Sequence, residues 1–265
     1  NAIAIGQRLV EDNPEDNESQ KILANGFREM GEVAETSNRD KAALLYGKSI
    51  AILQTLVAAH PEDSDLRHEL LARLFHLGRL EVLRGNSEIG CLHLTNCIAS
   101  GETWHSTYPC SHIKNAYVLL GQASVESQQL QRAESHYKKA WQLGNEYLEA
   151  WPKDQETLQM NSELELEIAG IHDKLGNINI SRQWLHSSRE TLKRLIKDTN
   201  VPPQDRSRCH EMLSHIAFLL DQLQTSKQEL LAAVAIAEHT LQEDPTNYDM
   251  WRQLWTYSRK MILVA

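Results

Sequence analysis

Residues 2–16 read AIAIGQRLVEDNPED and residues 49–63 read SIAILQTLVAAHPED, so the chain repeats itself at an offset of 47 residues. The two segments agree at 9 of 15 positions, and each contains a small residue followed twelve positions later by a proline. This spacing occurs three more times, and once in a stretched form of 14 residues between Ser188 and Pro202. A period of about 40 to 50 residues built from helical patterns is typical of a solenoid of stacked helix pairs.

The second helix of each expected pair carries a small residue, a bulky residue four positions later and another small residue three positions after that. Offsets of four and seven residues fall on one face of a helix, where small residues let a neighbouring helix approach closely. The five sets are Ala42/Tyr46/Ser49, Gly90/Leu94/Cys97, Ala133/Tyr137/Ala140, Ser181/Leu185/Ser188 and Ser226/Leu230/Ala233. Each set is preceded by a small residue on the first helix of the pair: Gly31, Gly78, Gly121, Ala169 and Ser214.

The junctions between pairs share a proline followed two residues later by a residue that can cap the next helix. Proline cannot continue a helix, and Asp, Asn or Ser side chains accept hydrogen bonds from the first free amides of a new one. The six expected caps are Asp16, Asp63, Ser111, Asp154, Asp205 and Asn247. Within the pairs, Gly85 and Gly176 mark well-specified turns, since glycine suits the left-handed backbone that follows a helix. The turns around Ser37, Gln128 and Asp221 carry weaker signals.

These patterns predict an all-α fold, a right-handed α-solenoid of antiparallel helix pairs, forming a single domain over residues 1–265. First helices are expected over 17–36, 64–83, 111–127, 155–174 and 205–220, and second helices over 40–59, 87–105, 131–150, 179–198 and 225–243. The corresponding repeats are about 15–61, 62–109, 110–152, 153–203 and 204–245. A half repeat over 1–14, with its helix at 1–12, precedes them, and a terminal segment over 246–265, with its helix at 248–262, follows.

The skeleton of the third pair resembles the tetratricopeptide repeat (TPR) at Gly121, Ala133, Tyr137 and Ala140, with Gln128 in place of the turn glycine. Gly78, Gly85, Gly90 and Leu94 match the same skeleton in the pair before it. The small positions are spaced by 48, 43, 48 and 45 residues, whereas the family's usual unit has 34 residues. This longer form is similar to repeats in large bacterial signalling proteins, such as the C-terminal regions of some serine/threonine kinases. The resemblance implies binding of a protein or peptide on the concave face lined by the first helices.

The charge and the cysteines narrow the class of partner and the compartment. The chain has 27 Lys+Arg against 36 Asp+Glu, a net charge of -9, and no basic run, which argues against nucleic acid or an anionic membrane as the main partner. We expect no membrane span, because no continuous apolar stretch approaches about 18 residues. The chain begins at Asn1 without a Met, so we expect a piece of a larger protein. Four cysteines are too few for a disulfide framework, and we expect buried free thiols and a cytoplasmic location.

No catalytic, metal-binding or cofactor-binding constellation emerges from the sequence. His210 and His215 are five residues apart, which on a helix turns the two imidazoles away from one another, unlike the zinc-protease spacing of four. Cys110 and His112, like Cys209 and His210, are better explained as a chance pairing in a chain with 12 histidines. Glycine-rich phosphate loops and nucleophile elbows are absent. We therefore expect no enzyme activity, no metal and no cofactor.

Other conspicuous residues have structural explanations. A solvated helix face accounts for Glu163, Glu165 and Glu167. Packing in the core accounts for Trp141 and Trp184, which lie beside the small positions of second helices. Trp251 and Trp255, one turn apart near the end, are expected to cap the solenoid or to cover a further element.

Counting along each first helix from its small position gives the residues expected on the concave face. This candidate binding face consists of Arg28, Glu32, Phe75, Arg79, Asn115, Val118, Gln122, Glu163, Leu166, Glu211 and His215. We expect Arg28 and Arg79 to be exposed, so that reversing their charge would weaken binding and leave the melting temperature nearly unchanged. The predicted function is a non-catalytic scaffold or sensor module that binds a protein or peptide, with self-association left open. The alternative is a regulatory domain that senses a small molecule or peptide signal inside the superhelix.

Overall fold

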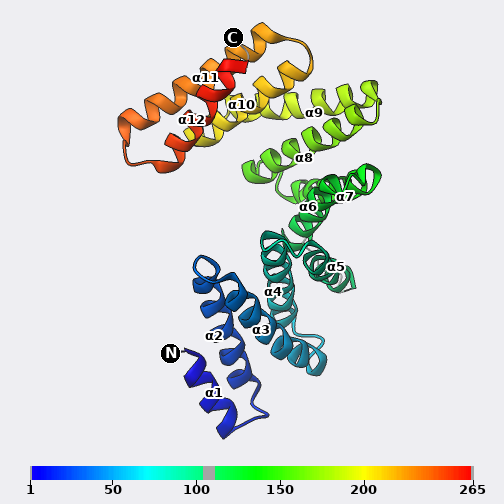
Figure 1. The fold of residues 1–265 in the computed structure, drawn as a ribbon, viewed down its shortest axis with the longest axis vertical. Helices are drawn as coiled ribbons and strands as arrows, with labels where there is room; N and C mark the ends of the chain where they lie inside the picture. Colours follow the sequence, from blue (N-terminus) through cyan, green and yellow to red (C-terminus); the bar gives the residue numbers. More distant parts are fainter. Residues whose placement is uncertain (1, 104–110, 264–265) are drawn as a thin grey trace. The chain divides into compact units, whose positions relative to one another are not determined.

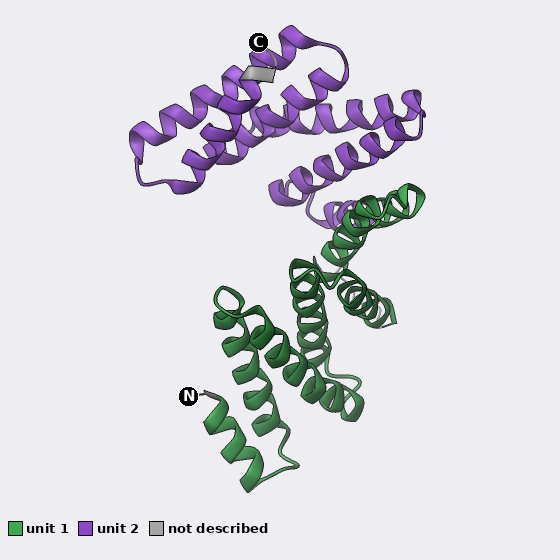
Figure 2. Cartoon of the chain, viewed as in Figure 1, with its two compact units in different colours: residues 1–140 green, residues 141–265 purple. Residues whose placement is uncertain are grey.

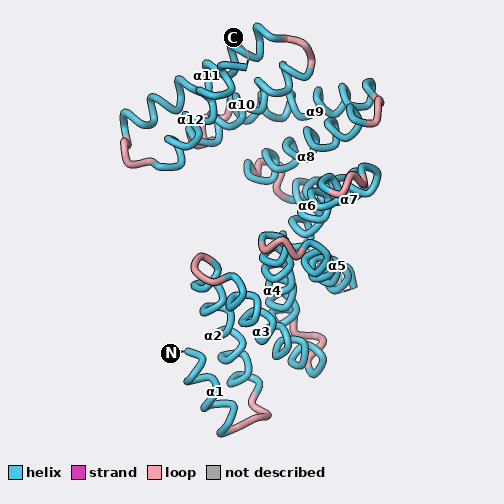
Figure 3. Tube along the Cα trace, in the orientation of Figure 1, coloured by secondary structure: helices cyan, strands magenta, loops and turns pink. Residues whose placement is uncertain are grey.

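The computed structural model describes residues 2–103 and 111–263, and over that part of the chain it contains twelve helices and no strand (Figures 1 and 3). The predicted junction at Pro109, with Trp104, His105 and Cys110, lies outside the described residues. The chain divides into two compact units, residues 1–140 and 141–265, and the division falls inside a helix (Figure 2). Each unit is described by itself.

Unit 1 contains six complete helices and the beginning of a seventh. These are α1 (Ala2–Asp12), α2 (Asn17–Glu35), α3 (Arg39–Ala59), α4 (Ser64–Leu83), α5 (Ser87–Thr103), α6 (Ser111–Glu126) and the first half of α7 (Leu130–Ala150). Each helix from α1 to α6 packs against the next one along the chain, and α4 also contacts α6. Consecutive helices joined by short turns run antiparallel, as the repeat predicts.

Unit 2 contains the rest of α7 and five further helices. These are α8 (Gln155–Lys174), α9 (Ile178–Lys197), α10 (Pro203–Leu219), α11 (Leu223–Glu243) and α12 (Tyr248–Leu263). One apolar cluster joins α8, α9 and α10 through residues such as Leu192, Val201 and Ile216. Another joins α11 to α12 through Leu230, Ala237 and Tyr257.

The small–bulky–small positions of the second helices are the core of both units. All fifteen are buried, as are the five small residues predicted on the first helices. A Cβ atom placed on Gly121 would lie 2.5 Å from the ring of Tyr137, and one on Gly78 would lie 2.8 Å from Leu94. Close approach of the two helices therefore requires the glycine, which confirms the packing role predicted for these residues.

In three of the five sets the last small residue also bonds the partner helix. Ser49 donates its hydroxyl to the carbonyl oxygen of Ala24 at 2.8 Å, and Ser188 donates to that of Ser162 at 2.9 Å. The thiol of Cys97 lies 3.4 Å from the carbonyl oxygen of Leu71 in the same way. A small polar side chain is thus satisfied inside the helix pair, where an unpaired one would be costly.

The predicted helix caps are confirmed at four junctions and wrong at one. The side chains of Asp16, Asp63, Asp154 and Asn247 accept hydrogen bonds from backbone amides of the first turn of the next helix. Asp205 lies inside the first turn of α10, because that helix begins two residues earlier at Pro203, where proline fits without losing a hydrogen bond. The remaining predicted cap, Ser111, is the first residue of α6, and the position before it is not described.

Four of the five turns inside the pairs share one backbone device whether or not they contain glycine; the turn after α2 has no residue with a positive φ. Gly85 and Gly176 have φ values of +85° and +76°, as predicted. Gln128 and Asp221 adopt the same left-handed conformation, each with φ of 58°. Each is followed by an amide that bonds a carbonyl five residues back, the arrangement that ends a helix with a left-handed residue. The weak sequence signals at these two turns therefore reflect residue choice and not a different geometry.

Helix α3 is long and apolar enough to meet a composition test for membrane spans, with a mean hydropathy of 1.5 over an 18-residue window. The sequence expectation that nothing in the chain approaches a span overlooked this helix. Core helices of globular proteins meet the same test, and one face of α3 is buried, including Tyr46 and Leu53. Its exposed residues include Lys48, Gln54 and Thr55 together with several alanines and Leu44.

Candidate functional site

The predicted face of unit 1 begins on α2, where its charged residues bond each other. Arg28 donates from Nη1 to both carboxylate oxygens of Glu32, at 2.8 and 2.9 Å, and from Nη2 to Glu29 at 3.3 Å. The side chain of Arg28 is 27% exposed, so it is half-buried and not the fully exposed group expected from the sequence. Much of the hydrogen-bonding capacity of these residues is already satisfied within the helix.

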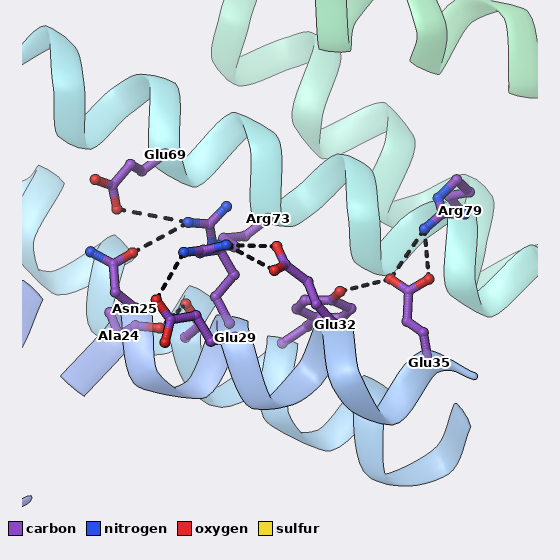
Figure 4. Close-up of polar contacts among 11 residues, drawn as sticks. Ala24, Asn25, Glu29, Glu32, Glu35, Glu69, Arg73 and Arg79 are labelled. Atoms are coloured by element: carbon purple, nitrogen blue, oxygen red, sulfur yellow. Dashed lines mark hydrogen bonds and ion pairs between the residues drawn. The ribbon is translucent and has the colours of Figure 1, made fainter. Parts of the chain in front are cut away.

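Arg79 ties α4 to α2. Its Nη2 donates to both oxygens of Glu35, at 2.8 and 3.1 Å, and the hydroxyl of Tyr46 donates to the same carboxylate at 2.6 Å (Figure 4). Burial, and the contact with Glu35, raise the pKa of Tyr46. Arg79 is also half-buried and not the fully exposed group expected from the sequence, because it is part of the packing between two helices.

A further arginine, which the sequence argument did not select, lies between the same helices. Arg73 is 7% exposed, and its Nη2 lies 3.4 Å from Oδ1 of Asn25 and 4.0 Å from Glu69 (Figure 4). Its Nε has no hydrogen-bond partner among the described residues. Burial, followed by the nearby charge of Arg28, lowers the pKa of Arg73. The helical count gave no signal for this residue, since it points between the helices and not onto the predicted face.

Phe75 lies in an aromatic cluster and not on an open surface. It is 9% exposed, with its ring centroid 5.6 Å from His76 and 5.5 Å from His112 of α6, which also stands 5.5 Å from His68. Burial, with the neighbouring charges of His76, His68 and Arg73, lowers the pKa of His112 to about 4. This cluster packs α6 against α4.

The other predicted residues of unit 1 lie along α6. Asn115 and Val118 are half-buried, and Gln122 is exposed. Beside them, the hydroxyl of Tyr117 donates to Glu102 of α5 at 2.7 Å.

In unit 2, the acidic run on α8 divides into different environments. Glu165 is 5% exposed and accepts hydrogen bonds from Trp141 Nε1 at 3.2 Å and from Ser187 at 2.7 Å. Burial raises its pKa. The interpretation of a solvated face is therefore wrong for Glu165, although Glu167 is exposed.

The neighbouring residues of α8 point to different surroundings. The carboxylate of Glu163 pairs with Arg208 of α10 at 2.7 Å, and burial raises its pKa also. Leu166 is half-buried against the apolar cluster of α8, α9 and α10.

Glu163 lines a cleft between the N-terminal halves of α8 and α10, with a volume of about 540 Å³. We name this the α8–α10 cleft. It is lined by Gln155, Glu156, Gln159, Met160, Glu163, Leu195, Val201, Pro202, Asp205 and Arg208. Its floor is formed where the stretched junction Val201-Pro202 follows α9. The 14-residue spacing before Pro202 was the one sequence signal that could have indicated it.

Glu211 and His215 line a smaller hollow of about 280 Å³ in the last helix pair. Its other lining residues are Ser214, Phe218, Ser226, Leu230 and Lys260. In the third pair, the ring of Tyr137 fills the space against Gly121, whereas here Leu230 faces Ser214, and the two serine hydroxyls bond each other at 3.0 Å. The ammonium group of Lys260 pairs with Glu211 at the rim.

One pair of tryptophans is half-buried, whereas the pair near the end of the chain is exposed. The rings of Trp141 and Trp184 meet edge to face at 5.2 Å, and both are half-buried. Trp251 and Trp255 are 50% and 63% exposed; the first donates to the carbonyl oxygen of Pro245 at 3.0 Å, and Arg259 lies 4.8 Å from the ring centre of the second.

Within the described ranges, no three His, Cys, Asp or Glu residues are grouped so that they could hold a metal ion. His210 contacts Glu229 of α11 at 2.7 Å, whereas His215 is exposed at the hollow, so the two histidines face different surroundings. Cys91, Cys97 and Cys209 are thiols that form no disulfide, and the last two are fully buried.

Several solved structures have a fold similar to that of this chain. BtubC (BKLC) from P. vanneervenii has a TM-score of 0.57 at 13% identity, over 84% of this chain and 84% of that chain. The S. pombe nuclear import adaptor Nro1 has a TM-score of 0.57 at 14% identity, over 96% of this chain and 89% of that one. TTC0263, a thermophilic TPR protein in Thermus thermophilus, matches at a TM-score of 0.43 and 14% identity, over 88% of this chain and 98% of that chain.

No family model matches the sequence, and no curated protein matches it either. The identities of the structural matches are low enough that they speak to the fold alone. The buried small–bulky–small positions of every pair make the chain TPR-like, and the matches to BtubC and Nro1 show that its fold is an all-α helical solenoid.

Proposed function

From a TPR-like fold whose first helices leave an open, charged cleft, we propose that this chain is a non-catalytic scaffold that binds a protein or peptide. The observation that carries the proposal is the α8–α10 cleft, where side chains from two successive first helices converge on one accessible space. Clefts of about 300 to 1,000 Å³ with a few convergent polar groups are the usual form of binding sites.

The chemistry of the cleft suits binding of a peptide, because its lining includes carboxylates, amides and an arginine that can bond polar groups of a partner. The buried thiol of Cys209 lies close enough to feel the charges of Asp205 and Glu163, yet burial raises its pKa to about 12, so at neutral pH it is not a nucleophile.

The alternative function, sensing of a small ligand, is favoured by the hollow at Ser214, Ser226 and Leu230. With about 280 Å³ it could accept one apolar group, and the pair of Glu211 with Lys260 at its rim could move in response. A small ligand would then protect the ends of α10 and α12 from hydrogen exchange without any peptide being present.

A selection of random twelve-residue peptides against the full chain would test the main proposal. Hydrogen exchange of the chain with and without a selected peptide locates the site. We expect protection on the first helices, above all on α8 and α10. If no peptide binds above background, or if protection is confined to the second helices α9 and α11, the proposal is wrong.

The cellular context is part of the same proposal. Attachment to a larger bacterial signalling protein is supported by the resemblance of the long repeats. A cytoplasmic location is supported by three cysteines that form no disulfide. Sequencing the complete gene tests the first, and fractionation of cells with an antibody to the chain tests the second. A gene without a signalling domain, or a chain found outside the cytoplasm, would contradict them.

A further inference from the structure

The α8–α10 cleft has a composition that specifies what can enter it. Its floor is apolar, with Leu195 and Val201 only 4% and 3% exposed and Met160 beside them. Its α8 wall carries two amide side chains one helical turn apart; Gln155 donates from its nitrogen to Asp198 at 3.2 Å and Gln159 bonds Glu163, so the two amide oxygens remain as acceptors. An apolar floor attracts an apolar side chain, and amides bond the backbone of an extended peptide.

The rim of the cleft is acidic after its internal ion pair is taken into account. Three carboxylates, those of Glu156, Glu163 and Asp205, face one guanidinium, that of Arg208. Arg208 is occupied by Glu163 at 2.7 Å. Among the described residues, the carboxylates of Glu156 and Asp205 have no hydrogen-bond or ion-pair partner. Two negative charges are therefore left for an incoming group.

Beyond the rim the carboxylates are balanced by cations. Glu211 and Glu167 lie near Glu163, but Glu211 pairs with Lys260 and Glu167 is close to Lys174. A cation placed at the rim gains from the unpaired carboxylates of Glu156 and Asp205, and a phosphate or an acidic peptide is repelled by them.

We propose that the α8–α10 cleft binds an extended segment of a protein partner that carries a lysine or arginine next to an apolar residue. The apolar side chain rests on Leu195 and Val201, and the basic side chain reaches Glu156 and Asp205 while Arg208 keeps its pair with Glu163. Gln155 and Gln159 bond the backbone of the segment. This inference rests on the proposed function and adds the chemistry of the partner.

Two capped, fluorescein-labelled nonapeptides, GSLKVRLSG and GSLEVELSG, are suitable probes for anisotropy titrations of the full chain. We expect the basic peptide to bind at least tenfold more tightly than the acidic one, and the difference to shrink as salt is raised. Hydrogen exchange should place its footprint on residues 155–163 and 201–208.

The decisive variant is the double substitution Glu156→Gln and Asp205→Asn, which removes two charges and keeps the shape of both side chains. It should weaken binding of the basic peptide about tenfold and abolish the preference over the acidic one. The matched control is Glu146→Gln with Glu149→Gln, which makes the same change in net charge at exposed positions on α7 of unit 2. The control should bind within about twofold of the unsubstituted chain. Circular dichroism of all variants verifies the fold.

The outcomes separate this inference from the proposed function. Equal binding of the two peptides, or equal loss in the control variant, overturns the inference, since charge in the cleft then selects nothing. Spermine that displaces the basic peptide at the peptide's own affinity also overturns it, because a free polycation would then suffice. Selected peptides that bind elsewhere leave the proposed function standing without this cleft, and a chain that binds no peptide at all removes both.

Discussion

Two successive first helices use their charged residues differently in the two units. In unit 1, α2 and α4 are tied by Arg79 and Glu35, with Arg73 buried between them. In unit 2, α8 and α10 share one ion pair, that of Glu163 with Arg208, and an open cleft lies beside it. One unit uses its charges to hold helices together, and the other leaves charges accessible to a partner.

This difference shows that charged residues on equivalent faces need not have equivalent roles. The side chains of Arg79 and Glu35 are 35% and 20% exposed, and both oxygens of the carboxylate are bonded. Arg208 is 52% exposed and meets one oxygen of Glu163. Half-buried ion pairs with charge-assisted hydrogen bonds contribute to stability, whereas exposed pairs contribute little.

The largest contrast is expected from matched charge reversals. Arg79→Glu breaks the half-buried pair and places a carboxylate against Glu35, so unit 1 should lose about 2 kcal/mol of unfolding free energy. Arg208→Glu should cost unit 2 no more than about 1 kcal/mol, since its pair is exposed. Urea unfolding followed by hydrogen exchange gives the stability of each unit separately. Equal losses of unfolding free energy in the two units would mean that the two ion pairs contribute alike, and would contradict this comparison.

A second contrast lies in the response of unit 1 to acid. The folded pKa of His112 is depressed to about 4 from 6.5, so the unfolded chain takes up the proton first. The stabilisation is complete above pH 6.5 and is lost as the pH falls through 4; with partial exposure allowed for, the loss is about 1.5 kcal/mol. Replacement of this residue, His112→Phe, should reduce the acid sensitivity of unit 1 by this amount and leave the smaller contributions of His76, His93 and His136, whose pKa values burial also lowers. The control His239→Phe, at an exposed site in unit 2, should leave both profiles unchanged. A profile still steep in His112→Phe would assign the acid sensitivity to other groups.

Unit 2 should respond with the opposite sign through Glu165. Burial raises its folded pKa above 4.5, so the folded state holds the proton to higher pH than the unfolded chain does. Its contribution is complete below pH 4.5 and is lost as the pH rises through the folded pKa. Glu165→Gln keeps an acceptor for Trp141 and Ser187 and removes the charge, so unit 2 should gain about 1 kcal/mol at about pH 7 and nothing at about pH 4. Glu238→Gln, at an exposed site, is the control. A loss at neutral pH would mean that the ionised carboxylate stabilises the fold.

The smallest effect on stability is expected from glycine substitutions at the left-handed turns, where the two units should respond alike. Gln128 in unit 1 and Asp221 in unit 2 share a φ of 58°, a conformation that favours glycine. Gln128→Gly and Asp221→Gly should each stabilise their own unit by about 0.5 kcal/mol, offset in part by greater freedom of the unfolded chain. Thermal unfolding monitored by hydrogen exchange measures both. The neighbouring change Gln129→Gly should destabilise unit 1, and a gain there would refute the explanation.

The fold could be predicted because each of its requirements is local or periodic. The small positions such as Gly121 and Ser188 repeat at fixed offsets, and the caps Asp63 and Asp154 follow a proline at a fixed distance. Each of these is determined by the backbone of one helix pair. The start of α10 was missed because Pro202 and Pro203 are adjacent, and the second proline opens the helix.

The site could be predicted only as a face. Helical periodicity places Arg79 and Phe75 on it, but whether they are free depends on Glu35 and His112, which come from other helices. Ion pairing between residues 44 positions apart has no periodic signature, and the burial of Phe75 depends on a helix of the next pair. The α8–α10 cleft likewise arises from an irregular junction, which a repeat-based argument treats as noise.

Each unit also contains a buried cysteine whose rate of chemical labelling reports how often the unit opens. Cys97 of unit 1 and Cys209 of unit 2 are both 0% exposed, while Cys91 is half-buried. A maleimide can reach a buried thiol only when the surrounding helices separate, so the labelling rate of each cysteine measures how often its unit opens locally. Mass spectrometry of cleaved peptides reads the two rates from one unmodified sample. The natural sequence thus contains the probes with which partner-induced stiffening of one unit can be timed against the other.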